Sequence, residues 1–351
     1  MLPRPEPSAG IAAYDLERSI CLASDSRRAD NYARYQAARG KHHIDPDYLP
    51  VKLDIENVSR CNFRCTMCAV AGWKNGKRAE DMSLACFKRL IDEQYGLVEI
   101  KLNGLGEALM QGDDYFEMIR YARERHIWVR MTTNASLLHL RDNYRKLVDS
   151  GVNEIDISID GADAATFERI RVGGDFERVT DNCFLLNDYL KSKGKASAKM
   201  WTLVQKENAN NLEFHVPLAC SLGFEQLVFS MQMHGWGNDK LAIRNADSMV
   251  LVPKERLREL VAAGEDIGVR VSFWDVNAKF DRENLCEWPF SRAVVTSDSR
   301  TVACCMVGDP SRHELGKGLT FMQAWQGDDY RAFRTAHVTG NLPKICVACY
   351  K

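Results

Sequence analysis

The sequence lacks the features that mark several common classes of protein. Its 351 residues contain 47 Lys and Arg against 48 Asp and Glu, and the net charge of −1 gives no basic surface for nucleic acid. No apolar run approaches the roughly 20 residues that a membrane-spanning helix needs. Residues 1–10 are Pro-rich and polar, without the apolar core of a signal peptide. We therefore expect a cytoplasmic enzyme that binds neither nucleic acid nor membrane.

Cysteine, in contrast, is frequent, with 12 residues. Disulfide frameworks belong to short secreted chains, so these cysteines indicate metal or cluster binding in a reducing compartment. Three of them lie in the run Arg60-Cys61-Asn62-Phe63-Arg64-Cys65-Thr66-Met67-Cys68. A [4Fe–4S] cluster is usually held by four Cys, so three neighbouring thiolates leave one iron open to a ligand that is not protein. Four-Cys zinc sites usually pair two C-x-x-C elements, which is a different spacing.

Strand and helix patterns alternate along the chain. Strands are predicted at 51–56, 97–102, 127–131, 154–159, 198–204 and 226–230, with a further candidate at 269–273. Helices are predicted near 16–39, at 84–91 after the N-cap Ser83, and at 115–125, 138–150, 176–191 and 212–222. Repeated βα units build a parallel sheet with helices outside, and this number of strands is too small for a closed eight-stranded barrel.

The pattern therefore predicts an α/β fold, an open partial (β/α)6 barrel at 51–275, preceded by an N-terminal extension at 1–50. Ligands of parallel α/β folds bind at the carboxyl ends of the strands. The cysteine run follows the first predicted strand, at such an end.

The three-cysteine run resembles that of the radical S-adenosylmethionine (radical SAM) superfamily, in which the open iron chelates the methionine part of SAM. Residues 102–108 (LNGLGEA) resemble the family's Gly-rich segment, which holds the SAM amino group. Gly104 and Gly106 would allow close approach of the backbone, and Glu107 would pair with the ammonium. Ala108 stands where the family commonly has Pro. An ordinary βα turn is the alternative for this segment.

Further elements extend the resemblance. Asn134 ends a Thr-Thr-Asn element after the third strand, and Ser158 begins a Ser-x-Asp-Gly element at the end of the fourth. The resemblance implies that Ser158 and Arg171 hold the carboxylate and ribose region of SAM. Asn134, Ser158 and Asp160 could instead only cap the following helices. Gln205 and Asn208 are weaker candidates.

A second set of cysteines, at 286, 304, 305, 346 and 349, resembles the C-terminal extension of the SPASM and Twitch subgroups, which binds auxiliary [4Fe–4S] clusters. The resemblance implies Cys286, Cys346 and Cys349 as ligands, with Cys304 preferred over Cys305 as the fourth. The full SPASM pattern has seven cysteines, so a single Twitch-like site at 276–351 is expected. A structural zinc site on the same thiolates is the alternative. Cys21, Cys86, Cys183 and Cys220 lie on helical or irregular segments, and most of them are expected in the core.

The resemblance implies reductive cleavage of SAM to a 5′-deoxyadenosyl radical, with a flavodoxin or ferredoxin-type electron donor. Our main hypothesis is oxidation or epimerisation at an alcohol carbon of a small sugar, cyclitol or nucleoside-like substrate, as in Twitch-type dehydrogenases, with the auxiliary cluster as electron acceptor. The alternative is modification of a ribosomally made peptide. An electron-transfer protein would normally supply a fourth Cys at the first site.

One further residue is a candidate for catalysis. His234, after the sixth strand, is a candidate general base. An epimerase would also need a Cys facing the cavity, for which Cys183 and Cys220 are considered.

Overall fold

The computed structural model describes residues 2–274, 280–318, 320–347 and 349–350, and its centre is one large sheet. In the described residues the strand order is β7-β6-β5-β4-β3-β2-β1-β8-β9. The barrel strands are β1 (Lys52–Ile55), β2 (Glu99–Leu102), β3 (Trp128–Thr133), β4 (Glu154–Ser158), β5 (Lys199–Leu203), β6 (Gln226–Ser230) and β7 (Arg270–Trp274). All neighbours among them are parallel. The six predicted strands and the seventh candidate are confirmed.

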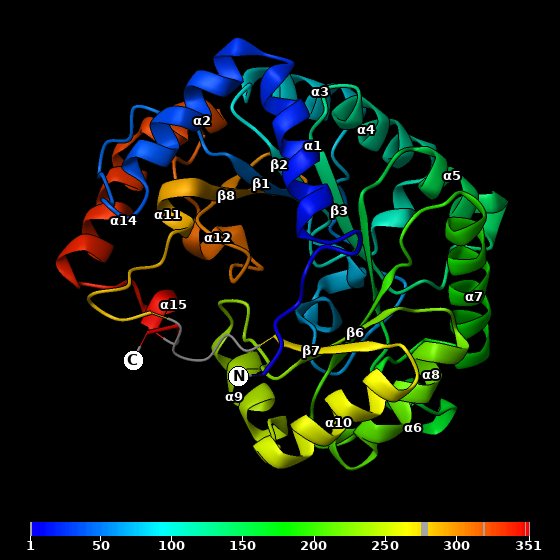
Figure 1. Ribbon diagram of the computed structural model, residues 1–351. Coiled ribbons are helices and arrows are strands. Elements are labelled where there is room, and N and C mark those ends of the chain that lie inside the picture. The colour runs from blue at the N-terminus through cyan, green and yellow to red at the C-terminus, as the bar shows by residue number, and fades with distance from the viewer. Residues whose placement is uncertain (1, 275–279, 319, 348, 351) are drawn as a thin grey trace.

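An arc of helices covers the outer face of this sheet (Figure 1). It comprises α3 (Leu84–Glu93), α4 (Asp113–Arg123), α5 (Asn143–Asp149), α6 (Ala164–Ile170), α7 (Phe176–Ser192), α8 (His215–Ser221), α9 (Asp239–Ser248) and α10 (Lys254–Asp266). Strand side chains that point outward, such as Leu53, Ile55 and Ile100, are fully buried in the same apolar cluster as Phe87 of α3. Ser83 caps α3 as predicted, because its Oγ accepts from the Cys86 N–H at 3.1 Å.

Two predicted helices are shorter than expected. The segment at 138–150 forms a short 3₁₀ turn, Leu140–Asp142, before α5, because Arg141 and Asp142 have positive φ values of 50° and 58°. The segment at 212–222 begins as the 3₁₀ helix Ala209–Phe214, and α8 follows it. Both breaks lie where a strand's carboxyl end turns into its helix.

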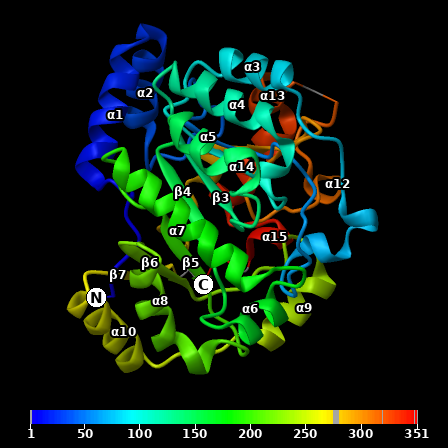
Figure 2. The same ribbon diagram turned by 90° about the vertical axis from the view of Figure 1, so that its right-hand side faces the viewer.

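The N-terminal extension closes the amino end of the barrel. The single helical stretch predicted near 16–39 is two helices, α1 (Ile11–Ala23) and α2 (Ser26–Ala38), because Asp25 is extended and its side chain accepts from the Arg27 N–H at 2.9 Å. Tyr14 Oη donates to Glu99 Oε2 at 2.7 Å, and Lys199 Nζ donates to the main-chain oxygen of Glu6 at 3.1 Å. Figure 2 shows α1 and α2 at one end of the barrel and α9 and α12 (Pro310–His313) at the other.

The C-terminal part continues the barrel sheet. Strand β8 (Arg292–Val295) pairs in parallel with β1, and β9 (Thr301–Val302) pairs antiparallel with β8. The remaining elements are α11 (Trp288–Ser291), α13 (Phe321–Gln326), α14 (Asp328–Thr339) and α15 (Lys344–Val347). The expected boundary after residue 275 lies outside the described residues. No helix in the described ranges is long and apolar enough to cross a membrane.

Candidate active site

The first three cysteines lie on a loop that follows β1 at the carboxyl end of the barrel. The Arg64 N–H donates to the Val172 oxygen at 2.8 Å and the Thr66 N–H to the Ile170 oxygen at 2.9 Å, which fastens the loop to the end of α6. On its other side, Arg60 Nη2 lies 2.6 Å from Asp81 Oδ2. The loop is therefore held at both flanks by neighbouring segments, and its cysteines have a fixed setting.

Each thiol lies in a setting that suits a cluster ligand. The Phe63 N–H donates to Cys61 Sγ at 3.4 Å, and Asn134 Nδ2 lies 3.9 Å from the same sulfur. Burial raises the pKa of Cys61 to about 12, with a further contribution from Glu107, and raises that of Cys65 to about 11. Buried thiols of this kind stay neutral unless a cation stabilises the thiolate. The donor set therefore fits an iron–sulfur cluster.

The described residues contain no group of three His, Cys, Asp or Glu side chains that could hold a single metal ion. A four-iron cluster has a different requirement, because each of its thiolates binds a separate iron.

The Gly-rich segment packs directly against the cysteine loop. A Cβ at Gly106 would lie 2.5 Å from the Arg60 oxygen and 2.6 Å from the Val58 oxygen, and the Glu107 N–H donates to that Arg60 oxygen at 2.9 Å. A Cβ at Gly104 would lie 2.4 Å from Cγ of Glu56. Both glycines are thus required for the close packing of these two segments.

Glu107 is buried between β2 and β3. Its Oε1 accepts from Thr133 Oγ1 at 2.7 Å, and its Oε2 accepts from the Asn134 N–H at 2.8 Å. Burial raises the pKa of Glu107. It therefore braces the end of β3 next to the cysteine loop, a structural role that the sequence did not reveal and that exists alongside the predicted pairing with an ammonium.

Arg171 and Asp160 form a buried ion pair beside the cysteines. Arg171 Nη2 lies 2.7 Å from Asp160 Oδ2, and Arg171 is 8% exposed. Although burial opposes the charged form, Asp160 raises the pKa of Arg171, with a contribution from the nearby Cys65. The Arg171 Nε atom is buried without a hydrogen-bond partner in the described residues. Arg171 Nε is thus a buried donor whose hydrogen bond is not supplied by the described residues.

The other predicted SAM contacts are placed differently. Asp160 does not cap a helix; Asp163 caps α6, and Asp160 Oδ1 accepts from the Leu203 N–H at 2.7 Å. Asn208 also links strands, donating to the Asp160 and Leu203 oxygens at 2.8 Å each. Gln205 Nε2 is buried and has no hydrogen-bond partner in the part of the chain described. Ser158, half-buried at the end of β4, lies at the same end of the barrel.

His234 lies in the loop after β6, and this loop contacts the cysteine loop through a residue that the sequence did not suggest. Asn245 Nδ2, on α9, donates both to the His234 oxygen at 2.6 Å and to the Met67 oxygen at 3.0 Å. The His234 ring is half-buried and meets Trp236 edge-on at 5.7 Å. The predicted general base is therefore at the correct end of the barrel.

The C-terminal cysteines form a second group. Burial raises the pKa of Cys346 to about 12, with Cys286 and Cys349 contributing, so these three thiols are neighbours. The Cys286 N–H donates to Tyr350 Oη at 2.9 Å. Cys304 joins this group, because its pKa is raised by burial and then by Cys305, Cys346 and Cys286.

Cys305 has a different setting from Cys304. Burial raises its pKa to about 11, Asp54 adds to the rise, and Lys101 and Arg292 oppose it. These three residues belong to or flank the barrel strands, although Cys305 is also close to Cys286. Ser299, where the family pattern has Gly, has φ of 61°, the left-handed conformation that favours glycine. The choice of Cys304 over Cys305 as the fourth ligand stays a prediction.

The remaining cysteines do not enter either group. Cys21 and Cys183 are fully buried, as expected, whereas Cys86 is half-buried and Cys220 is exposed on α8, so the core assignment is wrong for Cys220. Burial alone raises the pKa of Cys183. Neither Cys183 nor Cys220 is a thiol of the barrel interior.

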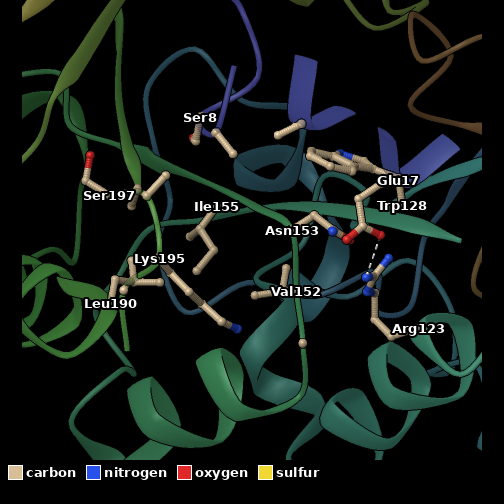
Figure 3. Close-up of a pocket in the computed structure, with 16 residues that line it drawn as sticks. Ser8, Glu17, Arg123, Trp128, Val152, Asn153, Ile155, Leu190, Lys195 and Ser197 are labelled. Atoms are coloured by element: carbon tan, nitrogen blue, oxygen red, sulfur yellow. Dashed lines mark hydrogen bonds and ion pairs between the residues drawn. The ribbon is translucent and has the colours of Figure 1, made fainter. Parts of the chain in front are cut away.

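A cavity of about 500 Å³ lies at the opposite end of the molecule (Figure 3). It is lined by Ser8 and Glu17 of the N-terminal extension and by Trp128, at the amino end of β3. Arg123 Nη2 lies 2.9 Å from Glu17 Oε2 at its wall. Because ligands of parallel α/β folds bind at the carboxyl ends, this cavity is separate from the candidate active site.

Comparison with protein families agrees with this geometry. Residues 57–215 match the model of the radical SAM superfamily, and residues 286–350 match that of an iron–sulfur cluster-binding domain, SPASM. The chain therefore contains a radical SAM domain followed by a C-terminal SPASM domain. These domains imply a SAM-binding [4Fe–4S] cluster and auxiliary cluster binding. The match is to SPASM as a whole, so the finer Twitch-type assignment stays a prediction.

Individual relatives are more distant. Mycofactocin maturase MftC of Mycolicibacterium smegmatis is 27% identical over 194 residues, covering 54% of this chain and 47% of that protein. The chain spans about half the length of the curated relatives it matches. The crystal structure of Streptococcus suis SuiB bound to precursor peptide SuiA has a TM-score of 0.65 at 14% identity, covering 86% of this chain and 70% of that one. Native anSMEcpe with bound AdoMet and Cp18Cys peptide has a TM-score of 0.58 at 18% identity, covering 86% and 88%. These likenesses confirm the predicted fold.

Proposed function

We propose that this chain cleaves SAM reductively at a cluster held by Cys61, Cys65 and Cys68 and abstracts hydrogen from a C–H bond of a peptide. The observation that carries the proposal is the three-thiol loop at the carboxyl end of the barrel, in which Cys65 is buried, Cys61 and Cys68 are half-buried, and backbone N–H groups donate to sulfur. A [4Fe–4S] cluster at these thiols, with SAM at its open iron, would supply the electron and the 5′-deoxyadenosyl radical. A flavodoxin or ferredoxin-type protein is the proposed electron donor.

The protein residues bind and orient in this proposal. The backbone N–H of Phe63 stabilises the Cys61 thiolate, and Asn134 lies beside the same sulfur, fixed by Glu107. Arg171, with its buried Nε donor, is proposed to hold the SAM carboxylate or ribose region, with Asp160 as its counter-ion. Gly104, Gly106 and Ser158 complete the proposed SAM contacts.

Cys286, Cys304, Cys346 and Cys349 are proposed to hold one auxiliary [4Fe–4S] cluster. When bound, that cluster would supply an acceptor for one electron. An oxidised product would then form when the substrate radical loses a proton and this electron. Cys346 is close enough to Cys286 and Cys349, and Cys304 to Cys346 and Cys286, for their charges to interact, which supports the assignment.

A peptide is the substrate that the comparisons favour. SuiB is bound to a precursor peptide in its crystal structure, anSMEcpe is bound to a peptide, and MftC is named a maturase. These relatives support peptides as the class of substrate. They do not identify which residues of this chain would bind one. The modification itself is epimerisation, crosslinking or side-chain oxidation. Which of these occurs depends on how the substrate radical reacts after hydrogen abstraction.

A second candidate is oxidation or epimerisation of a small polar molecule. The observation that favours it is the charged interior of the barrel, which Tyr14 and the N-terminal extension close at the amino end. His234 is the proposed general base for deprotonating an alcohol carbon in this case.

Anaerobic reconstitution tests the proposed chemistry. We expect about eight iron atoms per chain, as two four-iron clusters require, and 5′-deoxyadenosine after reduction with SAM. A Cys65→Ser variant should lose 5′-deoxyadenosine formation. A Cys286→Ser variant should lose about half of the iron but should still form 5′-deoxyadenosine. No 5′-deoxyadenosine from protein with an intact first cluster would refute the assignment, and zinc at the C-terminal cysteines would refute the auxiliary cluster. Solvent deuterium in the product would indicate epimerisation.

A further inference from the structure

The inner face of the barrel, the side of the sheet that faces away from the helices, carries many charged side chains. Along β1, β2 and β8, inward positions alternate with buried apolar ones, and register partners share a face. The charged inward residues of β1–β5 and β8 are the cations Lys52, Lys101, Arg130, Lys199 and Arg292 and the anions Asp54, Glu99, Glu154 and Asp156. There is one more cation than anion in this set.

Most of these charges are paired with one another near the amino end of the barrel. Arg130 lies 3.4 Å from Asp156 and 3.9 Å from Glu99, and Lys199 lies 3.6 Å from Asp156. Lys52 pairs with Glu99, and Lys199 also pairs with Glu154. Three cations thus balance three anions in this network.

Lys101, Arg292 and Asp54 remain outside the network. In the described ranges neither Lys101 nor Arg292 has a carboxylate within ion-pair distance, and the Arg292 guanidinium lies 5.3 Å from the centre of the Trp288 ring. All three residues are half-buried, and Asp54 is the register partner of Lys101. Two cations therefore share one acidic neighbour inside the barrel.

Cys305 lies near the same three residues. The charges of Asp54, Lys101 and Arg292 all act on its thiol, so Cys305 lies near these groups. Although the surrounding protein raises the pKa of the thiol, the residue keeps surface that is open to solvent, so a reagent can reach it. Asp54 in turn is influenced by Lys101 and Arg292, so the four groups form one cluster.

We propose that Lys101 and Arg292 bind an anionic group of the substrate, a carboxylate or a phosphate, and that Cys305 lies beside this group. The inference deepens the proposed function, on which it rests for placing the substrate in the barrel. Cations that are partly removed from water and lack a partner are costly, and a bound anion offsets that cost. Arg292 suits either anion, because its guanidinium forms bidentate hydrogen bonds with both.

The test uses Cys305 as its own probe in the anaerobically reconstituted protein. Iodoacetate and iodoacetamide both alkylate the thiolate, so the ratio of their rates at one cysteine cancels its pKa and reports the preference for a negative reagent. Peptide mass spectrometry measures this ratio at Cys305 and at the exposed reference Cys220. The proposed cluster at Cys304 adds its own negative charge, so the ratio at Cys305, normalised to Cys220, is compared between the wild type and charge variants; removing one cation within about 7 Å should change it about threefold.

Variants of both signs sharpen the test. Lys101→Met and Arg292→Met should each lower the ratio at Cys305 relative to the wild type, whereas Asp54→Asn should raise it. Unchanged iron content in each variant shows that the fold and clusters are retained. Because labelling is measured without turnover, its outcome is independent of whether SAM is cleaved.

Protection experiments identify the anion. At constant ionic strength, inorganic phosphate should slow iodoacetate labelling of Cys305 if the substrate carries a phosphate, and N-acetylglycine should do so if it carries a carboxylate. The proposal is overturned if neither protects, if the ratio at Cys305 is the same in the wild type, Lys101→Met and Arg292→Met, or if Cys305 is not labelled by either reagent.

Discussion

Gly106→Ala should disrupt the first cysteine loop. The new Cβ would lie 2.5 Å from the Arg60 oxygen and 2.6 Å from the Val58 oxygen, about 0.9 Å inside the ordinary contact limit of 3.4 Å. Both atoms belong to the backbone of the segment that leads into Cys61, so relief requires movement of that segment. Overpacking of this kind costs about 1–3 kcal/mol.

The assay combines iron content with thermal unfolding. Gly106→Ala should lose about half of the iron, because only the first cluster depends on this loop, and its Tm should fall by about 2–4 °C for each kcal/mol. Gly72→Ala is the matched control, since Gly72 follows the same cysteines and a Cβ there meets nothing within 4 Å. Full iron content and unchanged stability in Gly106→Ala would refute the packing argument.

Three other perturbations follow from the structure. Arg171→Met should raise the Kd for SAM at least about tenfold in equilibrium dialysis at unchanged iron content. Adding Asp160→Asn should restore stability but not affinity for SAM, because it removes the buried carboxylate that Arg171→Met leaves unpaired. Arg334→Met should lower the free energy of unfolding by about 3 kcal/mol in denaturant titration, because three main-chain oxygens lose their donor. Burial acts to raise the pKa of Glu99, but the charges of Lys52 and Arg130 outweigh burial and lower this pKa to about 2. The stability from this depressed pKa is present above about pH 4.5 and lost as the pH falls towards 2, so acid titration should show a steeper loss in the wild type than in Glu99→Gln.

The repeated βα pattern was sufficient to predict the barrel, because each strand and helix shows its own local periodicity. Strand β8 was missed because Arg292–Val295 is short, and its pairing with β1 is a contact between residues far apart in the sequence. The break between α1 and α2 depends on Asp25, whose capping geometry is local but did not interrupt the helical pattern.

The candidate site was predictable where the spacing of residues in the sequence indicates their chemistry. It was not predictable where their role depends on tertiary contacts. The three-cysteine run is such a spacing. The bracing role of Glu107 and the Asn245 link between two loops arise from contacts between segments far apart in the sequence, as does the closeness of Cys305 to Asp54. A sequence shows the residues of such contacts without showing that they meet.

The pairing of β8 with β1 also fixes the relation between the two cysteine groups. One loop leaves the carboxyl end of β1, and the strand beside it leads through β9 to Cys304. Adjacent strands lie about 4.8 Å apart, so hydrogen bonds rather than a linker set the interval between the two groups. We therefore expect the electron-transfer path between two centres held at these sites to depend on the pairing of β8 with β1.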